Sequence, residues 1–228
     1  MNDTVDIERY LSKKDPALGC AIRIVRAAKG ERLRPPHSKD NVFQSLVRAI
    51  IYQRSSEASG STVYSHLEKI AGGKLAPGKI LSLSIKEIQK AGLAQSKATY
   101  ILNLTHWFDA NPKVAKKLPA MSDEQVIDTL TDIPGIGLWT VNVLLVFKLG
   151  RLDIAPPPDA VIRGIAQIVY GLKSLPSVDF IRQKTDLWRP YRSIATMYLY
   201  QATKLKITAA DIRRGHSKID EAGIRSGT

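Results

Sequence analysis

Apolar residues recur every three or four positions along most of the chain, and no convincing alternation of apolar and polar residues interrupts this pattern. Such spacing is typical of amphipathic helices rather than strands, so the sequence predicts an all-α protein. The clearest stripe predicts a helix that is capped by Asp40 and ends near Gln53. Its apolar positions are Val42, Phe43, Leu46, Val47, Ile50 and Ile51.

Local signals mark where other helices begin and end. The next helix is expected to end at Gly72-Gly73, which suits a left-handed terminus. Ser84 with Glu87, and Ser122 with Gln125, predict capping boxes, in which each residue of a pair bonds the backbone amide of the other. Further helices are expected over residues 98–108, where Asn111-Pro112 ends the helix, and from Asp159, Ser177 and about Ser193, followed by a partly frayed basic tail after Ile207.

The length of 228 residues allows a sizeable buried core. We expect one domain, residues 1–228, folded as two helical lobes: residues 40–149 form a central lobe, and residues 1–39 plus 150–228 form the second. No apolar run approaches the length of a membrane-spanning helix, and Asp3, Asp6 and Glu8 interrupt the start of the chain. We therefore expect neither a membrane segment nor a leader.

Lysine and arginine outnumber aspartate and glutamate by 34 to 21, which gives a formal net charge of +13. This balance favours polyanionic partners, nucleic acid before an acidic membrane surface, although solvated lysines alone produce the same count. The single cysteine, Cys20, excludes an intrachain disulfide and any four-cysteine iron–sulfur or zinc site. We expect a reducing, intracellular location: the nucleus in a eukaryote or the cytoplasm in a bacterium.

The most informative segment is Ile133-Pro134-Gly135-Ile136-Gly137, a short turn between helices expected at residues 126–130 and 140–148. Its glycines allow the backbone to approach a phosphate, and the next helix begins with free amides and the positive end of its dipole. A helix-hairpin-helix of this kind holds a DNA backbone without reading bases. The predicted contacts are Gly135, Ile136, Gly137 and Thr140, and an ordinary interhelical turn is the alternative.

About twenty residues after the hairpin, Asp159 opens a helix behind three prolines. A plain helix cap is the simplest explanation of an aspartate at such a place, but the distance to the hairpin favours a catalytic one. The segment 130–163 resembles the signature of the helix-hairpin-helix DNA glycosylase superfamily. Trp139 and the sequence Trp188-Arg-Pro-Tyr-Arg-Ser193 resemble its alkylation-repair, 3-methyladenine branch, and the resemblance runs over residues 40–203.

This resemblance implies a two-lobed helical bundle with a DNA cleft between the lobes, and an enzyme whose catalytic carboxylate is Asp159. Breaking a glycosidic bond builds positive charge on the sugar, which a fixed anion stabilises. Related bifunctional enzymes carry a nucleophilic lysine just after the hairpin, where this chain has Leu138 and Trp139. The implied activity is therefore that of a monofunctional DNA-3-methyladenine glycosylase, which uses water to release alkylated purines such as 3-methyladenine and 7-methylguanine from duplex DNA in base excision repair.

Aromatic residues are candidates for the base pocket, because an electron-poor alkylated base favours an aromatic face. Trp139 is the first candidate, with a core position against the hairpin as its alternative, and Tyr52 and Tyr191 follow. Trp188 is expected to be structural. Further DNA contacts are predicted at Gln53, Arg54, Ser55, Arg163, Arg192 and Ser193.

The resemblance also implies a bound ion. In resembling proteins the hairpin carbonyls hold a monovalent cation that bridges to a phosphate, so a structural Na⁺ or K⁺ is expected at the carbonyls of Thr131, Ile133 and Ile136. No other cofactor is expected. A catalytic metal is not expected, since the chain has one cysteine and its four histidines form no close pair: His37, His66, His106 and His216.

One loop departs from the family's pattern. The family usually has Gln-Gln and then a bulky apolar residue, which fills the gap left by a flipped nucleotide, whereas this chain has Gln53-Arg54-Ser55-Ser56 and Ala58 in place of a basic residue. Ser55 is too small to fill that gap, so flipping would depend on Arg54 or another loop.

The alternative function is therefore a glycosylase-like protein that binds damaged DNA or abasic sites with little or no excision, and a generic helical DNA-binding or scaffold protein is a third. We expect a monomer that binds double-stranded DNA containing damaged bases or abasic sites, and no membrane.

Overall fold

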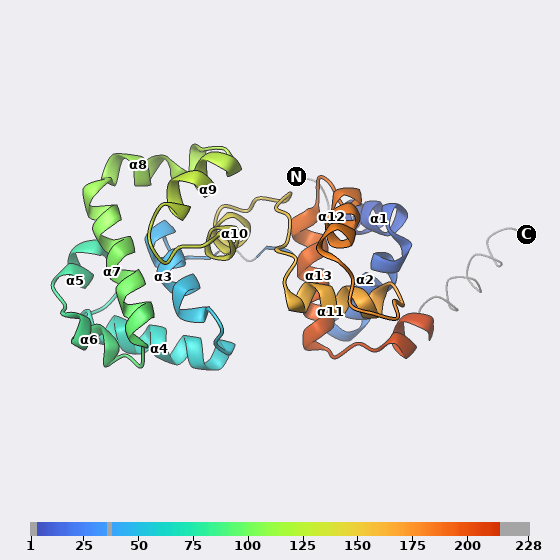
Figure 1. Ribbon diagram of the computed structural model, residues 1–228, viewed down its shortest axis with the longest axis horizontal. Coiled ribbons are helices and arrows are strands. Elements are labelled where there is room, and N and C mark those ends of the chain that lie inside the picture. The colour runs from blue at the N-terminus through green and yellow to red at the C-terminus, as the bar shows by residue number, and fades with distance from the viewer. Residues whose placement is uncertain (1–3, 36–37, 215–228) are drawn as a thin grey trace, which may run out of the picture. The chain divides into compact units, whose positions relative to one another are not determined.

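The computed structural model describes residues 4–35 and 38–214. Over these residues the chain forms helices and no β-strand, which confirms the all-α prediction. The contacts divide the chain into two compact units, which we call the central unit, Pro36–Gly150, and the terminal unit, Met1–Pro35 with Arg151–Thr228. Each unit has its own set of helices (Figure 1).

The helices of the central unit are α3 (Val42–Tyr52), α4 (Glu57–Ile70), α5 (Pro77–Leu81), α6 (Ile85–Gln89), α7 (Gln95–Ala110), α8 (Pro112–Lys117), the 3₁₀ helix η1 (Leu118–Ala120), α9 (Asp123–Thr131) and α10 (Leu138–Phe147). Those of the terminal unit are α1 (Thr4–Lys14), α2 (Pro16–Lys29), α11 (Ala160–Val169), α12 (Val178–Leu187) and α13 (Arg192–Lys204).

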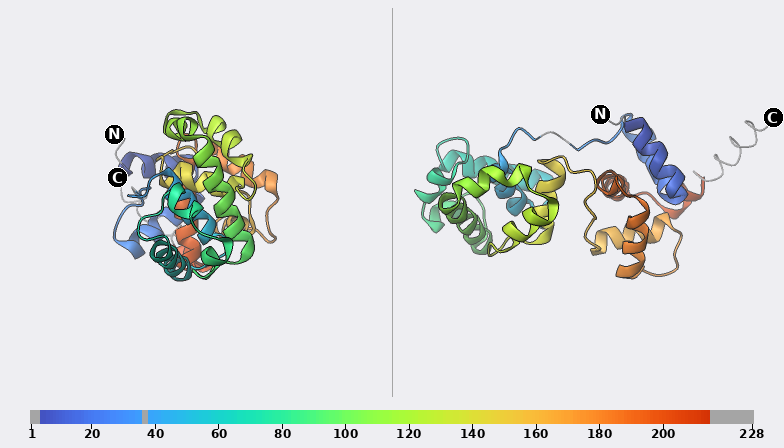
Figure 2. Two further views of the ribbon diagram at one scale, coloured as in Figure 1. Left: turned by 90° about the vertical axis from the view of Figure 1, so that its left-hand side faces the viewer. Right: turned by 90° about the horizontal axis from the view of Figure 1, so that it is seen from above.

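In the central unit, α3 packs between α7 and α10 (Figures 1 and 2). The apolar stripe of α3 makes this possible, because five of its six predicted apolar positions are buried. Phe43 of α3 meets Phe108 of α7 edge to face, with ring centroids 5.2 Å apart. The helix that the sequence marked most clearly is thus the central element of its unit.

The cap of α3 corrects the sequence prediction. Asn41, and not Asp40, is the N-cap: its Oδ1 accepts the Gln44 amide at 2.9 Å, and Gln44 Oε1 accepts the Asn41 amide at 2.9 Å. Because Asn41 already occupies the cap, Asp40 pairs with Arg48 instead, at 2.6 Å from its Nε. The Arg48 guanidinium also lies 3.7 Å from the ring centroid of Tyr64, which ties α3 to α4.

Other helix ends agree with the sequence. The capping boxes of Ser84 with Glu87 and of Ser122 with Gln125 are both present, and Gly72 and Gly73 have positive φ after α4. The short helices α5 and α8 were not predicted, because each has too few residues to show a period. Residues 209–214 are helical and Ile212 is buried, so this part of the predicted tail is not frayed; the rest of it lies outside the described residues.

The terminal unit is built around α2 and α13, which pack against each other. The carboxylate of Asp15, the N-cap of α2, joins that helix to the ends of α11 and α12: Oδ1 accepts the Leu18 amide at 3.1 Å, and Oδ2 accepts the Tyr170 hydroxyl at 2.5 Å and the Trp188 indole N–H at 2.9 Å. Burial and the negative charge of Asp15 raise the pKa of Tyr170. Trp188 is fully buried with its N–H satisfied, as expected of a structural tryptophan.

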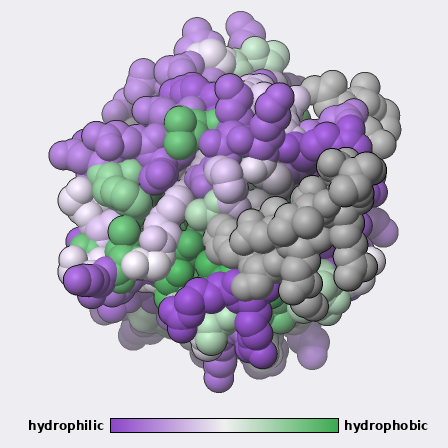
Figure 3. All heavy atoms as spheres, turned by 90° about the vertical axis from the view of Figure 1, so that its right-hand side faces the viewer, coloured by the Kyte–Doolittle hydropathy of each residue, from purple (hydrophilic) through white to green (hydrophobic). Residues whose placement is uncertain are grey.

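One face of the molecule is largely polar. In the face shown in Figure 3, hydrophilic side chains cover most of the described area and apolar ones form small patches. Among the described helices, none has both the length and the apolar character needed to cross a membrane.

Candidate functional site

The hairpin turn joins α9 to α10 in the central unit. Gly135 has a φ of +96°, a conformation that favours glycine, and the Ile136 amide donates to the Ile133 carbonyl at 3.0 Å. Gly137 is the N-cap of α10, and within the described chain no side chain caps this helix start. Because Gly137, Leu138 and Trp139 are also exposed, an anion can reach the first amides of α10 and the positive end of its dipole.

Helix α7 supports the hairpin from beneath. The ring of Tyr100 lies so close to Gly135 that a Cβ added there would be 2.1 Å from Tyr100 Cδ1, and Asn103 Nδ2 donates to the Pro134 carbonyl at 3.1 Å. The space around Gly137 is open: a Cβ there meets nothing within 4 Å. The two hairpin glycines therefore differ, since Gly135 is required by packing and Gly137 is not.

Thr140 and Gln53 form an internal link within the central unit. Thr140 is fully buried, its Oγ1 accepts a hydrogen bond from Gln53 Nε2 at 2.8 Å, and its amide donates to the Gly137 carbonyl at 2.9 Å. This corrects the expectation that Thr140 contacts DNA, because its polar groups serve the protein. The Gln53 side chain likewise connects the end of α3 to the start of α10.

The loop after α3 is organised by Lys97 of α7. Its Nζ donates to the carbonyls of Ile51 and Gln53, both at 2.7 Å, and to the Ser55 hydroxyl at 3.1 Å. Partial burial lowers the pKa of Lys97. Arg54 has a φ of +54° and is exposed, as is Ser55. A positive charge beside the carbonyls at a helix C-terminus is favourable. Lys97 therefore stabilises the end of α3 and holds the shape of the loop that was predicted to contact DNA.

The predicted base-pocket residues differ in their surroundings. Trp139 is 38% exposed, so it is not the core tryptophan of the alternative explanation. Tyr52 lies against Gly60 of α4, where an added Cβ would come within 2.8 Å of the ring. Tyr191 belongs to the terminal unit and packs edge to face on Tyr10, with centroids 5.4 Å apart. Of the three, Trp139 is the exposed one, while Tyr52 and Tyr191 are half-buried.

Asp159 is the N-cap of α11 in the terminal unit. Its Oδ1 accepts the Ile162 amide at 2.8 Å, which fixes the carboxylate at the positive end of the helix. The hydroxyl of Tyr200, on α13, lies 3.5 Å from Oδ2. Burial and the charge of Asp159 raise the pKa of Tyr200, so Tyr200 stays protonated and is a donor to the carboxylate. One oxygen of Asp159 thus holds the helix, and among the described residues the other has only the long contact with Tyr200.

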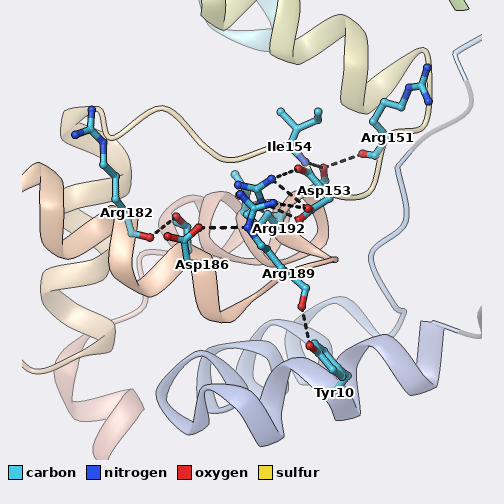
Figure 4. Close-up of polar contacts among 11 residues, drawn as sticks. Tyr10, Arg151, Asp153, Ile154, Arg182, Asp186, Arg189 and Arg192 are labelled. Carbon is cyan, nitrogen blue, oxygen red and sulfur yellow. Dashed lines mark hydrogen bonds and ion pairs between the residues drawn. The ribbon is translucent and has the colours of Figure 1, made fainter. Parts of the chain in front are cut away.

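Three residues of the terminal unit that were predicted to contact DNA are hydrogen-bonded to other parts of the protein. Ser193 is buried; its hydroxyl donates to the Arg151 carbonyl at 2.8 Å. Arg192 binds Asp153, with its Nε 2.7 Å from Oδ1 (Figure 4). Arg163 Nε donates to the Pro176 carbonyl at 2.7 Å. Burial rules out a DNA contact by Ser193, which corrects that expectation, and the arginines would have to exchange these partners to reach a phosphate.

Sequence reasoning gave no role to Lys97 or Tyr200. The sequence does contain a signal for Lys97. This lysine lies four residues before the buried Ile101, on the same side of α7, and a partly buried ammonium group needs hydrogen-bond acceptors. Tyr200 follows Tyr198 and Leu199, which are both buried, and nothing local shows which of the tyrosines turns towards Asp159. Only the packing of α13 against α11 shows it.

Among the described residues, no three His, Cys, Asp or Glu side chains gather closely enough to hold a metal ion. At the hairpin, the Ile133 carbonyl accepts the Ile136 amide and keeps a second lone pair, so it can serve as an oxygen ligand for a monovalent cation.

The comparisons with known proteins agree with this geometry. The chain matches the family described as HhH-GPD superfamily base excision DNA repair protein over residues 47–190. The alkylbase DNA glycosidase-like protein mag2 of Schizosaccharomyces pombe is 27% identical over 203 residues, covering 87% of this chain and 93% of mag2.

Two solved structures share the fold. A DNA-3-methyladenine glycosidase from Bacillus halodurans has a TM-score of 0.73 and 29% identity, covering 88% of this chain and 91% of that one. The Schizosaccharomyces pombe 3-methyladenine DNA glycosylase Mag1, in complex with abasic DNA, has a TM-score of 0.75 and 23% identity, covering 87% and 97%. Since the family match takes in well over half of the residues, this chain belongs to the HhH-GPD superfamily of base excision DNA repair proteins.

Proposed function

We propose that this chain is a monofunctional DNA glycosylase that hydrolyses the N-glycosidic bond of alkylated purines, such as 3-methyladenine and 7-methylguanine, in duplex DNA. One observation carries the proposal: Asp159 is anchored through Oδ1 at the start of α11, while Oδ2 has only a 3.5 Å contact with Tyr200 within the part of the chain that the structure describes. Family membership and the names of the relatives, an alkylbase DNA glycosidase-like protein and a DNA-3-methyladenine glycosidase, support the same activity.

The chemistry requires an anion rather than an acid. A purine base methylated at N3 or N7 is cationic while it is bound to the sugar, so when the C1′–N bond breaks, the base takes both electrons and leaves neutral, and the positive charge moves to the sugar. A carboxylate fixed at a helix N-terminus stabilises that charge as it develops. Water then attacks C1′ and loses its proton, which leaves an abasic site. Asp159 is the catalytic residue in this scheme because it acts on the reacting sugar.

The hairpin supplies DNA binding in the proposal. Gly137, Leu138 and Trp139 expose the start of α10 to a phosphate, and Trp139 offers an aromatic face to the flipped base. A Na⁺ or K⁺ at the carbonyls of Thr131, Ile133 and Ile136 would add charge that complements the phosphate. Because Leu138 follows the hairpin glycines where a lysine would be needed for a Schiff base, no strand cleavage is expected. The protein is proposed to act as a monomer on double-stranded DNA.

Excision from methylated DNA tests the proposal. Wild-type protein is expected to release 3-methyladenine or 7-methylguanine, and Asp159→Asn, which keeps the shape and removes the charge, to lose this release by about a thousandfold or more. Affinity for an abasic-site duplex should stay similar or rise. Undiminished release by Asp159→Asn would remove Asp159 from catalysis, and borohydride trapping of a covalent adduct would refute water as the nucleophile.

A second function is favoured by the loop at Ser55. Its hydroxyl is bound by Lys97 at 3.1 Å, and the side chain is too small to replace a flipped base. A protein with this loop could bind abasic or damaged DNA and excise little, and the relative mag2 carries the description glycosidase-like. Tight and selective abasic-site binding, with no base release from methylated DNA by the wild-type chain, would select this function over the first.

A further inference from the structure

The loop that leads to Asp159 is attached to the first residues of α13. Ser193 makes three hydrogen bonds to it: the Ser193 amide donates to the Leu152 carbonyl at 2.9 Å, the hydroxyl donates to the Arg151 carbonyl at 2.8 Å, and the hydroxyl accepts the Ile154 amide at 3.0 Å. A buried serine therefore replaces the strand or helix partner that this irregular backbone lacks.

Arg192 adds a charged fork beside Ser193. Its Nε and one terminal nitrogen bind the two carboxylate oxygens of Asp153 at 2.7 and 3.1 Å, and that terminal nitrogen also donates to the Asp153 carbonyl at 2.6 Å. Arg189 reaches the same carboxylate at 3.1 Å (Figure 4). The Arg192 side chain is only 13% exposed, so this bidentate pair is screened less than an ordinary surface ion pair.

The far end of the loop meets the same helix. Tyr200, whose hydroxyl lies 3.5 Å from Asp159 Oδ2, stands seven residues after Ser193 on α13. Seven residues are about two helical turns, so Ser193 and Tyr200 lie on one side of α13, about 10 Å apart along its axis. Between the two attachments stand Pro156, Pro157 and Pro158, whose rings fix φ and limit the bending of the chain.

We propose that Asp153 and Arg192 are positioning residues for the catalytic carboxylate. Together with Ser193 they fix the start of the proline-containing loop to α13, and we call these contacts the clamp. Through the clamp, α13 determines the position of Asp159. The catalytic consequence rests on the proposed glycosylase function. Misplacing a catalytic group by about 1 Å can cost about a hundredfold in rate, so loosening the clamp should slow base release without removing any group that touches the sugar.

The test compares Asp153→Asn with Asp186→Asn. Asp186 pairs with Arg189 at 3.3 Å in the same segment, and among the described residues its side chain makes no hydrogen bond or ion pair with the loop, so its loss is a matched removal of one carboxylate. Two quantities are measured: the single-turnover rate of 7-methylguanine release from methylated duplex, and the amide hydrogen exchange of Ile154 and Ser193. Asp153→Asn should exchange faster at both amides and release base about tenfold to a hundredfold more slowly, with its Kd for abasic duplex within about threefold of wild type. Asp186→Asn should change none of these.

Each outcome has a distinct meaning. Unchanged exchange in Asp153→Asn overturns the clamp, and faster exchange with a wild-type rate overturns its positioning role. If Asp153→Asn does not fold, Arg192→Lys, which keeps the charge and loses the fork, is judged by the same two criteria. A wild-type chain that releases no base overturns the proposed glycosylase function and the positioning role with it, while the exchange measurement still decides whether the clamp holds the loop.

Discussion

Gly135 lies against the ring of Tyr100 so closely that a single added carbon would stand 2.1 Å from Tyr100 Cδ1, whereas the same carbon at Gly137 would meet nothing within 4 Å. The packing of the protein therefore requires a glycine at position 135 of the hairpin but not at position 137. Gly135 also has a φ of +96°, while the φ of Gly137 is −97°, which any residue adopts. The sequence alone suggested that both glycines serve the approach of a phosphate.

Gly137→Ala should weaken DNA binding and leave the fold unchanged. The added methyl group stands at the start of α10, where a phosphate would approach, and loss of one charge-assisted hydrogen bond weakens affinity by about tenfold. Gly135→Ala should instead lower the free energy of unfolding by about 2–4 kcal/mol through overpacking and a strained φ. Urea unfolding and duplex binding distinguish the two, and equal affinity for wild type and a folded Gly137→Ala would refute phosphate binding at this hairpin.

Lys97→Met should disrupt the loop that follows α3. Removing Nζ leaves the carbonyls of Ile51 and Gln53 and the Ser55 hydroxyl without this donor, at a cost of about 1–3 kcal/mol in the free energy of unfolding. Affinity for an abasic-site duplex should fall more than affinity for an intact duplex, because the loop rather than the phosphate contact is altered. Lys116→Met, on the helix α8 that buries no residue, is the control for loss of one positive charge. Equal losses in both variants would show that Lys97 acts only through its charge.

Alkaline pH should destabilise the protein through buried tyrosines. Burial, with the charge of Asp40, raises the pKa of Tyr64 to about 12, from about 10 in an unfolded chain. Below pH 10 this group contributes its full stabilisation, and between pH 10 and about 12 the unfolded chain ionises first, so the free energy of unfolding falls by about 2–3 kcal/mol. Tyr64→Phe should show a shallower decline over this window in denaturant titrations. The same slope in wild type and variant would contradict a raised pKa at Tyr64.

Much of this fold follows from local sequence signals. The stripe of α3, the capping boxes at Ser84 and Ser122 and the glycine-ended α4 were predictable, because helix periodicity and cap chemistry act over a few residues. The cap of α3 was assigned to Asp40 although Asn41 performs it, since both residue types cap helices and the choice depends on the Arg48 partner of Asp40.

The surroundings of the site residues were less predictable, because they depend on contacts between distant segments. Asp159 and the hairpin can be recognised from residue types and spacing. Thr140 and Ser193, by contrast, are buried and bonded to Gln53 and to the loop at residues 151–154, and no local pattern indicates either the burial or these partners. Both residues were predicted to contact DNA because they are polar and lie within a motif, whereas their side chains form hydrogen bonds within the protein.

Ser55→Leu should increase affinity for an abasic-site duplex by about threefold to tenfold. The Ser55 side chain is exposed, and Lys97 keeps its bonds to the Ile51 and Gln53 carbonyls when the hydroxyl is lost, so the loop should retain its shape. A leucine side chain can then fill part of the gap left by a missing base and replace lost stacking, an apolar contribution of about 1 kcal/mol. Binding is measured on matched duplexes with and without the abasic site, and Ser55→Ala separates loss of the hydroxyl from gain of bulk. Weaker abasic-site binding by Ser55→Leu, with Ser55→Ala unchanged, would mean that a segment other than this loop enters the gap.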